Sequence, residues 1–197
     1  MSTQRAHQPC TALEKMDHGT QHKLVLIVAP DGAGKAKIIQ QWVQNWPESS
    51  LFPPLCLCID VENNQPIQFL SKLISILTIW DPIFEDCVDL QNVDEQQFLD
   101  NGSSEQCSIS DMPQKIETLL DAIINKLMDL TGDRFLIMLN YHHIENPRIH
   151  SMVAYLIDYL PSNLHLVITS QVTPPLQIPR LRARRELLEI GPDEVMR

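Results

Sequence analysis

Apolar runs and apolar helical stripes alternate along the chain, and this alternation predicts an α/β fold. Short apolar runs bounded by turn residues are typical of buried strands. They lie at 23–28, 55–61, 134–139, 164–169 and 186–190. Longer segments with an apolar residue every three or four positions predict amphipathic helices. They lie at 38–46, 67–77, 116–127 and 149–160. We therefore expect a mainly parallel sheet of about five strands, flanked by helices.

The first apolar run leads into a glycine-containing loop, Ala29-Pro30-Asp31-Gly32-Ala33-Gly34-Lys35-Ala36. In a P-loop, small residues let backbone N–H groups surround phosphates, a lysine reaches the terminal phosphates, and a Ser or Thr hydroxyl binds Mg²⁺. Ala36 stands where that hydroxyl is needed. We predict a nucleotide-binding loop without this magnesium ligand. Its residues are Ala29, Asp31, Gly32, Ala33, Gly34, Lys35, Ala36 and Lys37.

Composition narrows the class of protein. The 197 residues suit one domain with a proper core, and the formal net charge of −10 argues against a surface that contacts nucleic acid directly. No apolar stretch approaches the roughly 20 residues that span a bilayer, and the polar segment 1–20 lacks the apolar centre of a secretory signal. We expect a cytoplasmic protein without a membrane segment.

Changes in composition along the chain predict its layout. Residues 1–22 form a lead-in segment, 23–190 the P-loop NTPase-like domain, and 191–197 the start of a truncated following segment. The stretch 81–113 is acidic and contains neither Lys nor Arg. We expect it to be a flexible surface excursion.

Neither the cysteines nor the histidines have the spacing of a metal site. The five cysteines include no Cys-x-x-Cys pair, and Cys56 and Cys58 lie two apart in a strand, where we expect both to be buried on one face. His142, His143 and His150 lack the helical i, i+4 spacing and a nearby set of carboxylates. We expect no metal site.

Several segments, in this order and spacing, resemble the nucleotide-binding domain of MalT-like, LuxR-type transcriptional regulators of the STAND class. They are Leu24 to Lys35, Trp42, Asp60 to Leu73, Tyr141-His142 with Asn146-Pro147, Leu160 to Ser170, Thr173 to Leu176, and Leu181 to Arg184 with Leu188-Glu189. The resemblance implies a three-layer P-loop NTPase-like sandwich. It also implies a switch in which bound ATP or ADP selects between states of a larger regulator. Other domains of that regulator, or a regulatory protein, are then the expected partners.

The departures from this family fall on positions that carry chemistry. Leu139 and Asn140 replace the two acidic Walker B residues that help hold Mg²⁺ and orient water, and Gln171 replaces the arginine that senses the terminal phosphate. Losing one positioned group of this kind costs a factor of roughly 100 to 1,000 in rate. We therefore assign no catalytic residue, and expect ATP or ADP to bind without efficient hydrolysis and without firmly held Mg²⁺.

Two alternatives stay open at this point. In the first, the domain is a nucleotide-free pseudo-NTPase that acts only in protein–protein interaction, with the acidic stretch 81–113 as a candidate surface. In the second, it is an active ATPase in which Asp60 or Glu62 substitutes for the missing carboxylates.

Overall fold

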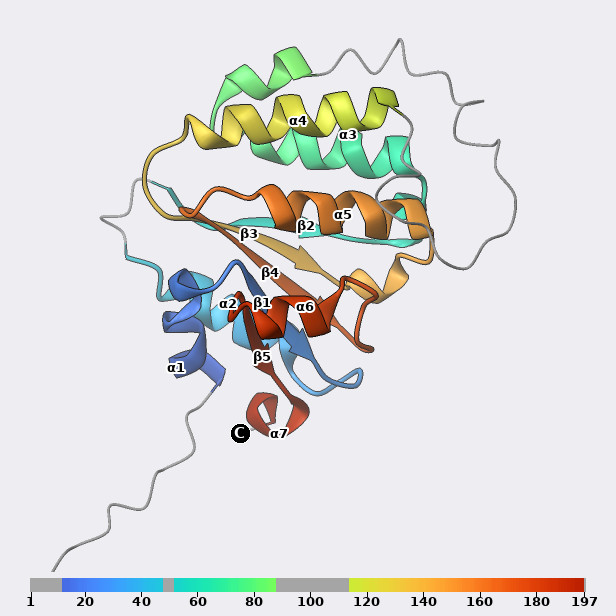
Figure 1. The fold of residues 1–197 in the computed structure, drawn as a ribbon. Helices are drawn as coiled ribbons and strands as arrows, with labels where there is room; N and C mark the ends of the chain where they lie inside the picture. The colour runs from blue at the N-terminus through green and yellow to red at the C-terminus, as the bar shows by residue number, and fades with distance from the viewer. Residues whose placement is uncertain (1–11, 48–51, 88–113, 197) are drawn as a thin grey trace, which may run out of the picture.

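A single parallel sheet organises the chain (Figure 1). The computed structural model describes residues 12–47, 52–87 and 114–196. The strand order is β2-β3-β4-β1-β5, and all four neighbouring pairs are parallel. The strands are β1 (Leu24–Val28), β2 (Leu55–Cys58), β3 (Arg134–Leu139), β4 (Leu164–Ser170) and β5 (Leu187–Ile190). The predicted α/β fold with five parallel strands is confirmed.

Helices cover both faces of the sheet, which gives the three layers (Figure 1). The larger core cluster joins one face to four helices: α3 (Pro66–Leu77), α4 (Gln114–Met128), α5 (Pro147–Tyr159) and α6 (Ile178–Ala183). The smaller cluster joins the other face to three helices: α1 (Ala12–Asp17), α2 (Lys35–Gln44) and α7 (Pro192–Val195). Because both faces are covered, the central strands are apolar at nearly every position, as in other buried parallel sheets.

Short 3₁₀ helices connect the regular elements: η1 (Gly19–Gln21), η2 (Val61–Asn64), η3 (Pro82–Cys87) and η7 (Tyr141–His143). The helix η3 lies at the start of the expected acidic excursion, and in it Phe84 is fully buried and Cys87 is nearly so. A buried phenylalanine anchors this part of the chain to α3 and α4 through the core. The rest of the expected excursion, 88–113, lies outside the described residues.

The edge strand β2 overturns one expectation. Cys56 and Cys58 do lie on one face, but both are exposed free thiols, whereas Leu55 and Leu57 are buried on the other face. Among the described strands, β2 pairs with β3 alone. The core cluster under α1 and α2 involves β1, β3, β4 and β5 but not β2. Neither of these two helices therefore covers the thiol face of the edge strand.

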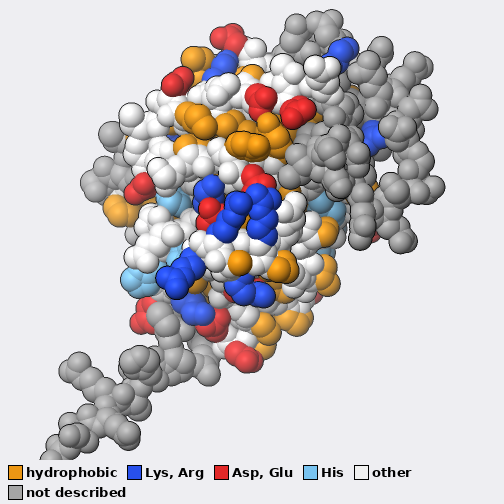
Figure 2. Space-filling model, in the orientation of Figure 1, with side chains coloured by type: hydrophobic (Ala, Val, Ile, Leu, Met, Phe, Trp, Pro, Cys, Tyr) orange, Lys and Arg blue, Asp and Glu red, His pale blue; other side chains and the backbone are white. Residues whose placement is uncertain are grey.

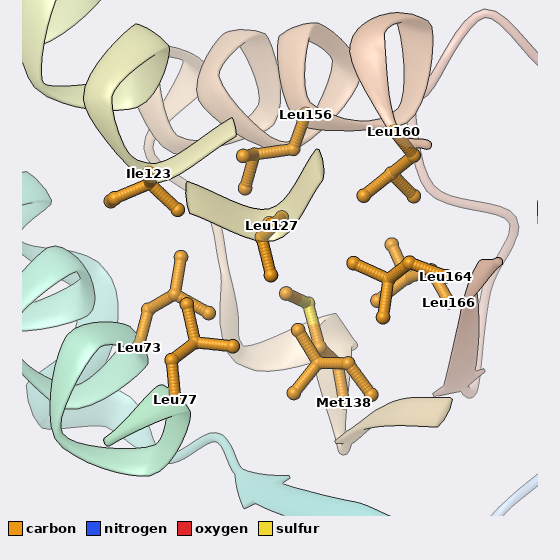
Figure 3. Close-up of a pocket in the computed structure, with 10 residues that line it drawn as sticks. Leu73, Leu77, Ile123, Leu127, Met138, Leu156, Leu160, Leu164 and Leu166 are labelled. Atoms are coloured by element: carbon orange, nitrogen blue, oxygen red, sulfur yellow. The ribbon is translucent and has the colours of Figure 1, made fainter. Parts of the chain in front are cut away.

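The larger core encloses a small cavity between β3, β4 and the helices α3, α4 and α5 (Figure 3). Its volume is about 20 Å³. It is lined by Leu73, Leu77, Ile123, Leu127, Leu136, Met138, Leu156, Leu160, Leu164 and Leu166. An apolar space of this size holds no water stably, because a buried water needs polar partners.

Among the described residues, none of the helices combines the length and apolar character that crossing a membrane requires.

Candidate functional site

The loop between β1 and α2 has the backbone of an anion-binding turn. Gly32 and Gly34 have φ angles of +73° and +99°, a region that side chains with a Cβ rarely adopt. A Cβ added at Gly32 would meet no atom within 4 Å, and one at Gly34 would meet only the carbonyl oxygen of Val195, at 3.9 Å. The glycines therefore serve the backbone conformation, and the loop keeps open space beside it.

The side chain of Lys35 lies against this loop. The residue is 8% exposed. Its Nζ donates hydrogen bonds to the carbonyl oxygens of Ala29 at 2.6 Å and Pro30 at 2.8 Å. Burial lowers the pKa of Lys35, and the nearby carboxylate of Asp31 opposes this by raising it. The ammonium group is thus fixed against the loop before any ligand arrives.

The N-terminus of α2 has no acidic residue in its first turn and no side-chain cap. Gly34 is the N-cap. Lys35 and Lys37 both lie in that turn, where the helix dipole disfavours positive charge. Free backbone N–H groups and two lysines at a helix N-terminus together favour a bound anion such as phosphate.

The carboxyl ends of β3 and β4 lie beside this loop. The backbone N–H of Ala29 donates to the carbonyl of Ser170 at 3.2 Å, which joins the loop to the end of β4. Ser170 is fully buried, and its Oγ has no hydrogen-bond partner in the part of the chain described. The backbone N–H of Asn140 donates to the hydroxyl of Thr169 at 3.1 Å. The sheet therefore brings the loop between β1 and α2 and the predicted Walker B position to one edge.

The positions that end β3 and follow β4 carry no carboxylate. Leu139 ends β3 with an aliphatic side chain, and Asn140 follows in a left-handed conformation, with φ of 60°. Gln171 is exposed beyond the end of β4. Within the described ranges there is also no group of three or more His, Cys, Asp or Glu side chains arranged to hold a metal ion.

Asp60, one of the proposed substitutes for the lost carboxylates, lies on the surface. Its carboxylate pairs with Lys72 at 3.2 Å, and its side chain is 53% exposed. Glu62 is also exposed, in the 3₁₀ helix that follows β2. A carboxylate paired with a surface lysine is poorly placed to orient water in a catalytic site, which needs preorganised charge away from solvent.

Two neighbours of the loop were not identified from the sequence as parts of the site. Burial lowers the pKa of His142. The nearby His143 and Lys35 lower this pKa further, and Asp31 raises it. Its Nδ1 is buried and has no hydrogen-bond partner among the described residues. The other neighbour is α7, whose Val195 carbonyl faces Gly34. The available signal was that His142 lies three residues after the end of β3, within the family-like pair Tyr141-His142, but from the sequence we considered this histidine as a site residue only for a metal.

Three arginines of the basic stretch 180–185 form ion pairs with carboxylates of the chain. Figure 2 shows Lys and Arg side chains gathered beside Asp and Glu side chains in the middle of the visible face. Arg182 binds both carboxylate oxygens of Glu189, at 2.9 and 2.8 Å, and Arg180 binds Asp158 at 2.9 Å. Arg184 lies 3.7 Å from the same Asp158. These arginines are neutralised within the chain, which argues against a phosphate clamp here.

No protein-family profile matches the chain. Sequence relatives are transcriptional regulators named MalT. The chain is 27% identical to the regulator of Vibrio cholerae over 179 residues, which is 91% of this chain and 18% of that protein. It is 30% identical to the regulator of Klebsiella pneumoniae over 189 residues, which is 93% of this chain and 18% of that protein. The chain thus spans less than a fifth of the length of the curated relatives it matches, and its resemblance to them is confirmed.

Solved structures with a similar fold include Cdc6p and ORC chains. The Cdc6p structure from Pyrobaculum aerophilum superposes with a TM-score of 0.51 and 12% identity, covering 95% of this chain and 47% of that one. A chain of Drosophila ORC bound to AT-rich DNA and Cdc6 gives a TM-score of 0.50 and 12% identity, covering 90% of this chain and 51% of that one. At this identity the likeness concerns the fold, which is that of P-loop ATPases.

Proposed function

We propose that this chain, which is similar over most of its length to a segment of MalT regulators, is the nucleotide-binding module of a STAND-type, LuxR-family regulator. It binds ATP or ADP in the loop between β1 and α2 and does not hydrolyse the nucleotide efficiently. The binding state then acts on other domains of the regulator or on a regulatory protein, and this module itself makes no direct contact with nucleic acid.

The geometry of the phosphate loop carries the proposal. Gly32 and Gly34 hold the left-handed backbone, and Lys35 is held over the loop by two carbonyl groups. The first turn of α2 carries two lysines and no carboxylate. Positive charge in the first turn opposes the helix dipole in an empty loop, and it becomes favourable when a phosphate accepts hydrogen bonds from the backbone N–H groups.

The chemistry of the surrounding positions supports binding without efficient turnover. Phosphoryl transfer depends on a positioned metal ion, an oriented water and a cation near the terminal phosphate. The side chains at these places are Ala36, Leu139, Asn140 and Gln171, none of which carries a charge. The cradle itself consists of backbone N–H groups and Lys35, so it does not depend on the lost side chains.

Calorimetric titration of the whole chain with ATP and with ADP tests the proposal. We expect 1:1 binding of both nucleotides with and without Mg²⁺, and phosphate release no faster than in buffer. Absence of heat under all four conditions would contradict nucleotide binding and favour the nucleotide-free alternative. Phosphate release that disappears in Lys35→Ala would instead support an active ATPase.

The Ala36→Thr variant restores the hydroxyl that usually binds Mg²⁺. Ala36 is exposed in the first turn of α2, so a threonine there has room. We expect Mg²⁺ to strengthen ATP binding more in this variant than in the wild type, by roughly tenfold, the low end of what one contact to a charged group contributes. Ala36→Val has the same shape without the hydroxyl and serves as the control. An equal Mg²⁺ effect in all three proteins would show that position 36 does not face the metal.

A further inference from the structure

The edge strand β2 carries two thiols on its outward face. Cys56 and Cys58 are both exposed and free. The alternate residues, Leu55 and Leu57, are buried on the other face. Cysteine is among the residue types most often buried in proteins, and exposed free thiols are usually avoided on a surface. Two such thiols at successive outward positions of one strand are therefore unusual, and their chemistry needs an explanation.

The spacing of the two thiols excludes a disulfide bond between them while the strand keeps its form. Residues two apart in a strand are separated by roughly 6.6 Å, whereas a disulfide needs its two Cβ atoms about 3.5–4.5 Å apart. The sulfur atoms can approach one another more closely than the Cβ atoms, because each turns about its own Cα–Cβ bond. An ion held between two sulfurs requires them to be about 4.6 Å apart, the sum of two metal–sulfur bonds of about 2.3 Å. The spacing therefore suits a bridging ion better than a direct S–S bond.

The side chains beside the two thiols on β3 contain no oxygen or nitrogen atom. Cys56 pairs in register with Ile137, and Cys58 pairs with Leu139. Both partners are apolar and belong to the packing under α2. In the part of the chain that the structure describes, no third His, Cys, Asp or Glu completes a metal-binding group with them. Zn²⁺, which takes four ligands, is thus poorly served, whereas thiolates alone are the ligands that select Cu(I).

Cys56 is not activated for nucleophilic chemistry. Partial desolvation raises the pKa of Cys56, and the neighbouring Cys58 raises it further. Reactive cysteines instead have a lowered pKa, which a nearby cation or a helix N-terminus brings about. The effect of Cys58 on Cys56 also means that the two sulfurs lie close enough to influence one another, as two ligands of one ion must.

We propose that Cys56 and Cys58 form a two-coordinate site for a soft monovalent cation such as Cu(I). Each thiol releases its proton, and the two thiolates bind the ion from opposite sides. The ion stays Cu(I) throughout, so the step needs no oxidant or reductant. The expectation of no metal site rested in part on burial of both thiols, which the structure overturns.

This site is separate from the nucleotide loop. The strands β3 and β4 lie between β2 and β1 in the sheet (Figure 1). Neighbouring strands are about 4.8 Å apart, which places β2 roughly 14 Å from β1. Cu(I) binding therefore does not depend on the proposed nucleotide function, and either can fail without the other.

Anaerobic titration with Cu(I), in competition with a coloured Cu(I) chelator, tests the site in the full chain. Cys10 and Cys107 lie outside the described residues, so both are first replaced by serine. We expect one ion per monomer, an unchanged elution volume in gel filtration, and two sulfur ligands by X-ray absorption. Failure to take Cu(I) from the chelator, a dimer with one ion for two chains, or a third ligand on the ion would each overturn the proposal.

Single replacements in the same background show whether the two thiols act together. Cys56→Ser and Cys58→Ser should each weaken Cu(I) binding at least about 100-fold, the upper end of what losing even an outer-shell partner of a metal costs. Cys87→Ser is the matched control, because Cys87 is only 6% exposed, in η3, and it should leave Cu(I) binding unchanged. The melting temperature of each metal-free variant checks that it is folded. Binding that survives either of the first two replacements would mean that one thiol holds the ion adventitiously, and would contradict the paired site.

Discussion

Replacing Lys35 by alanine is expected to weaken the binding of ATP and ADP about 100-fold, because a charged donor to the phosphates is worth roughly 1.5–3 kcal/mol per hydrogen bond. The side chain is buried against the loop, and its Nζ is already held by the carbonyls of Ala29 and Pro30. Calorimetric titration of the wild type and of Lys35→Ala, at equal ionic strength, measures the difference directly.

Lys37→Ala is the matched control for this prediction. Lys37 lies two residues further along the first turn of α2 but is exposed. Removing an exposed charge near a helix N-terminus changes the binding of an anion by about 0.3–1 kcal/mol, or roughly two- to fivefold. If the two variants lost affinity equally, general attraction by positive charge would explain binding, and the specific role of Lys35 would be wrong.

Replacing Phe135 by alanine is expected to lower the free energy of unfolding by about 3–5 kcal/mol, the usual cost of deleting a buried aromatic side chain. Phe135 is 1% exposed under α2. Its ring meets Trp42 at 4.9 Å and Trp46 at 5.3 Å between ring centres, both nearly edge-to-face. Such pairs add to the burial term. Urea unfolding and a fall in melting temperature of about 10 °C would record the loss.

Val172→Ala provides the control for the stability measurement. Val172 is 63% exposed just after β4, so its truncation should change stability by less than about 0.5 kcal/mol. If Phe135→Ala lost as little stability as Val172→Ala, the aromatic cluster of Trp42, Trp46 and Phe135 would contribute little to holding α2 on the sheet.

The sheet was predictable from the sequence because its central strands, β1, β3 and β4, are buried on both faces. A run such as Leu24 to Val28 is apolar throughout, as a strand between two helical layers requires. Cys56 and Cys58 were misjudged because sequence does not reveal which strand lies at the edge. The pairing order places β2 there, beyond the core cluster that α1 and α2 share.

The conformation of the loop between β1 and α2 was equally accessible, since its pattern is local in sequence. Gly32, Gly34 and Lys35 lie within four residues, and the left-handed backbone of the two glycines follows from residue type. The contacts around it were not accessible, because they join segments distant in the chain. The carbonyl of Val195 beside Gly34 depends on the strand order, and so does the stacking of Arg134 on Phe52. Neither contact has a motif.

The two carbonyl contacts of Lys35 also bear on how fast a ligand can associate. Fixing a long, flexible side chain during binding costs about 0.5–1.5 kcal/mol, but folding has already fixed this one. An arriving phosphate meets a group that needs no conformational search. Association should then be rapid and limited by diffusion, and differences in affinity among nucleotides should come from their dissociation rates.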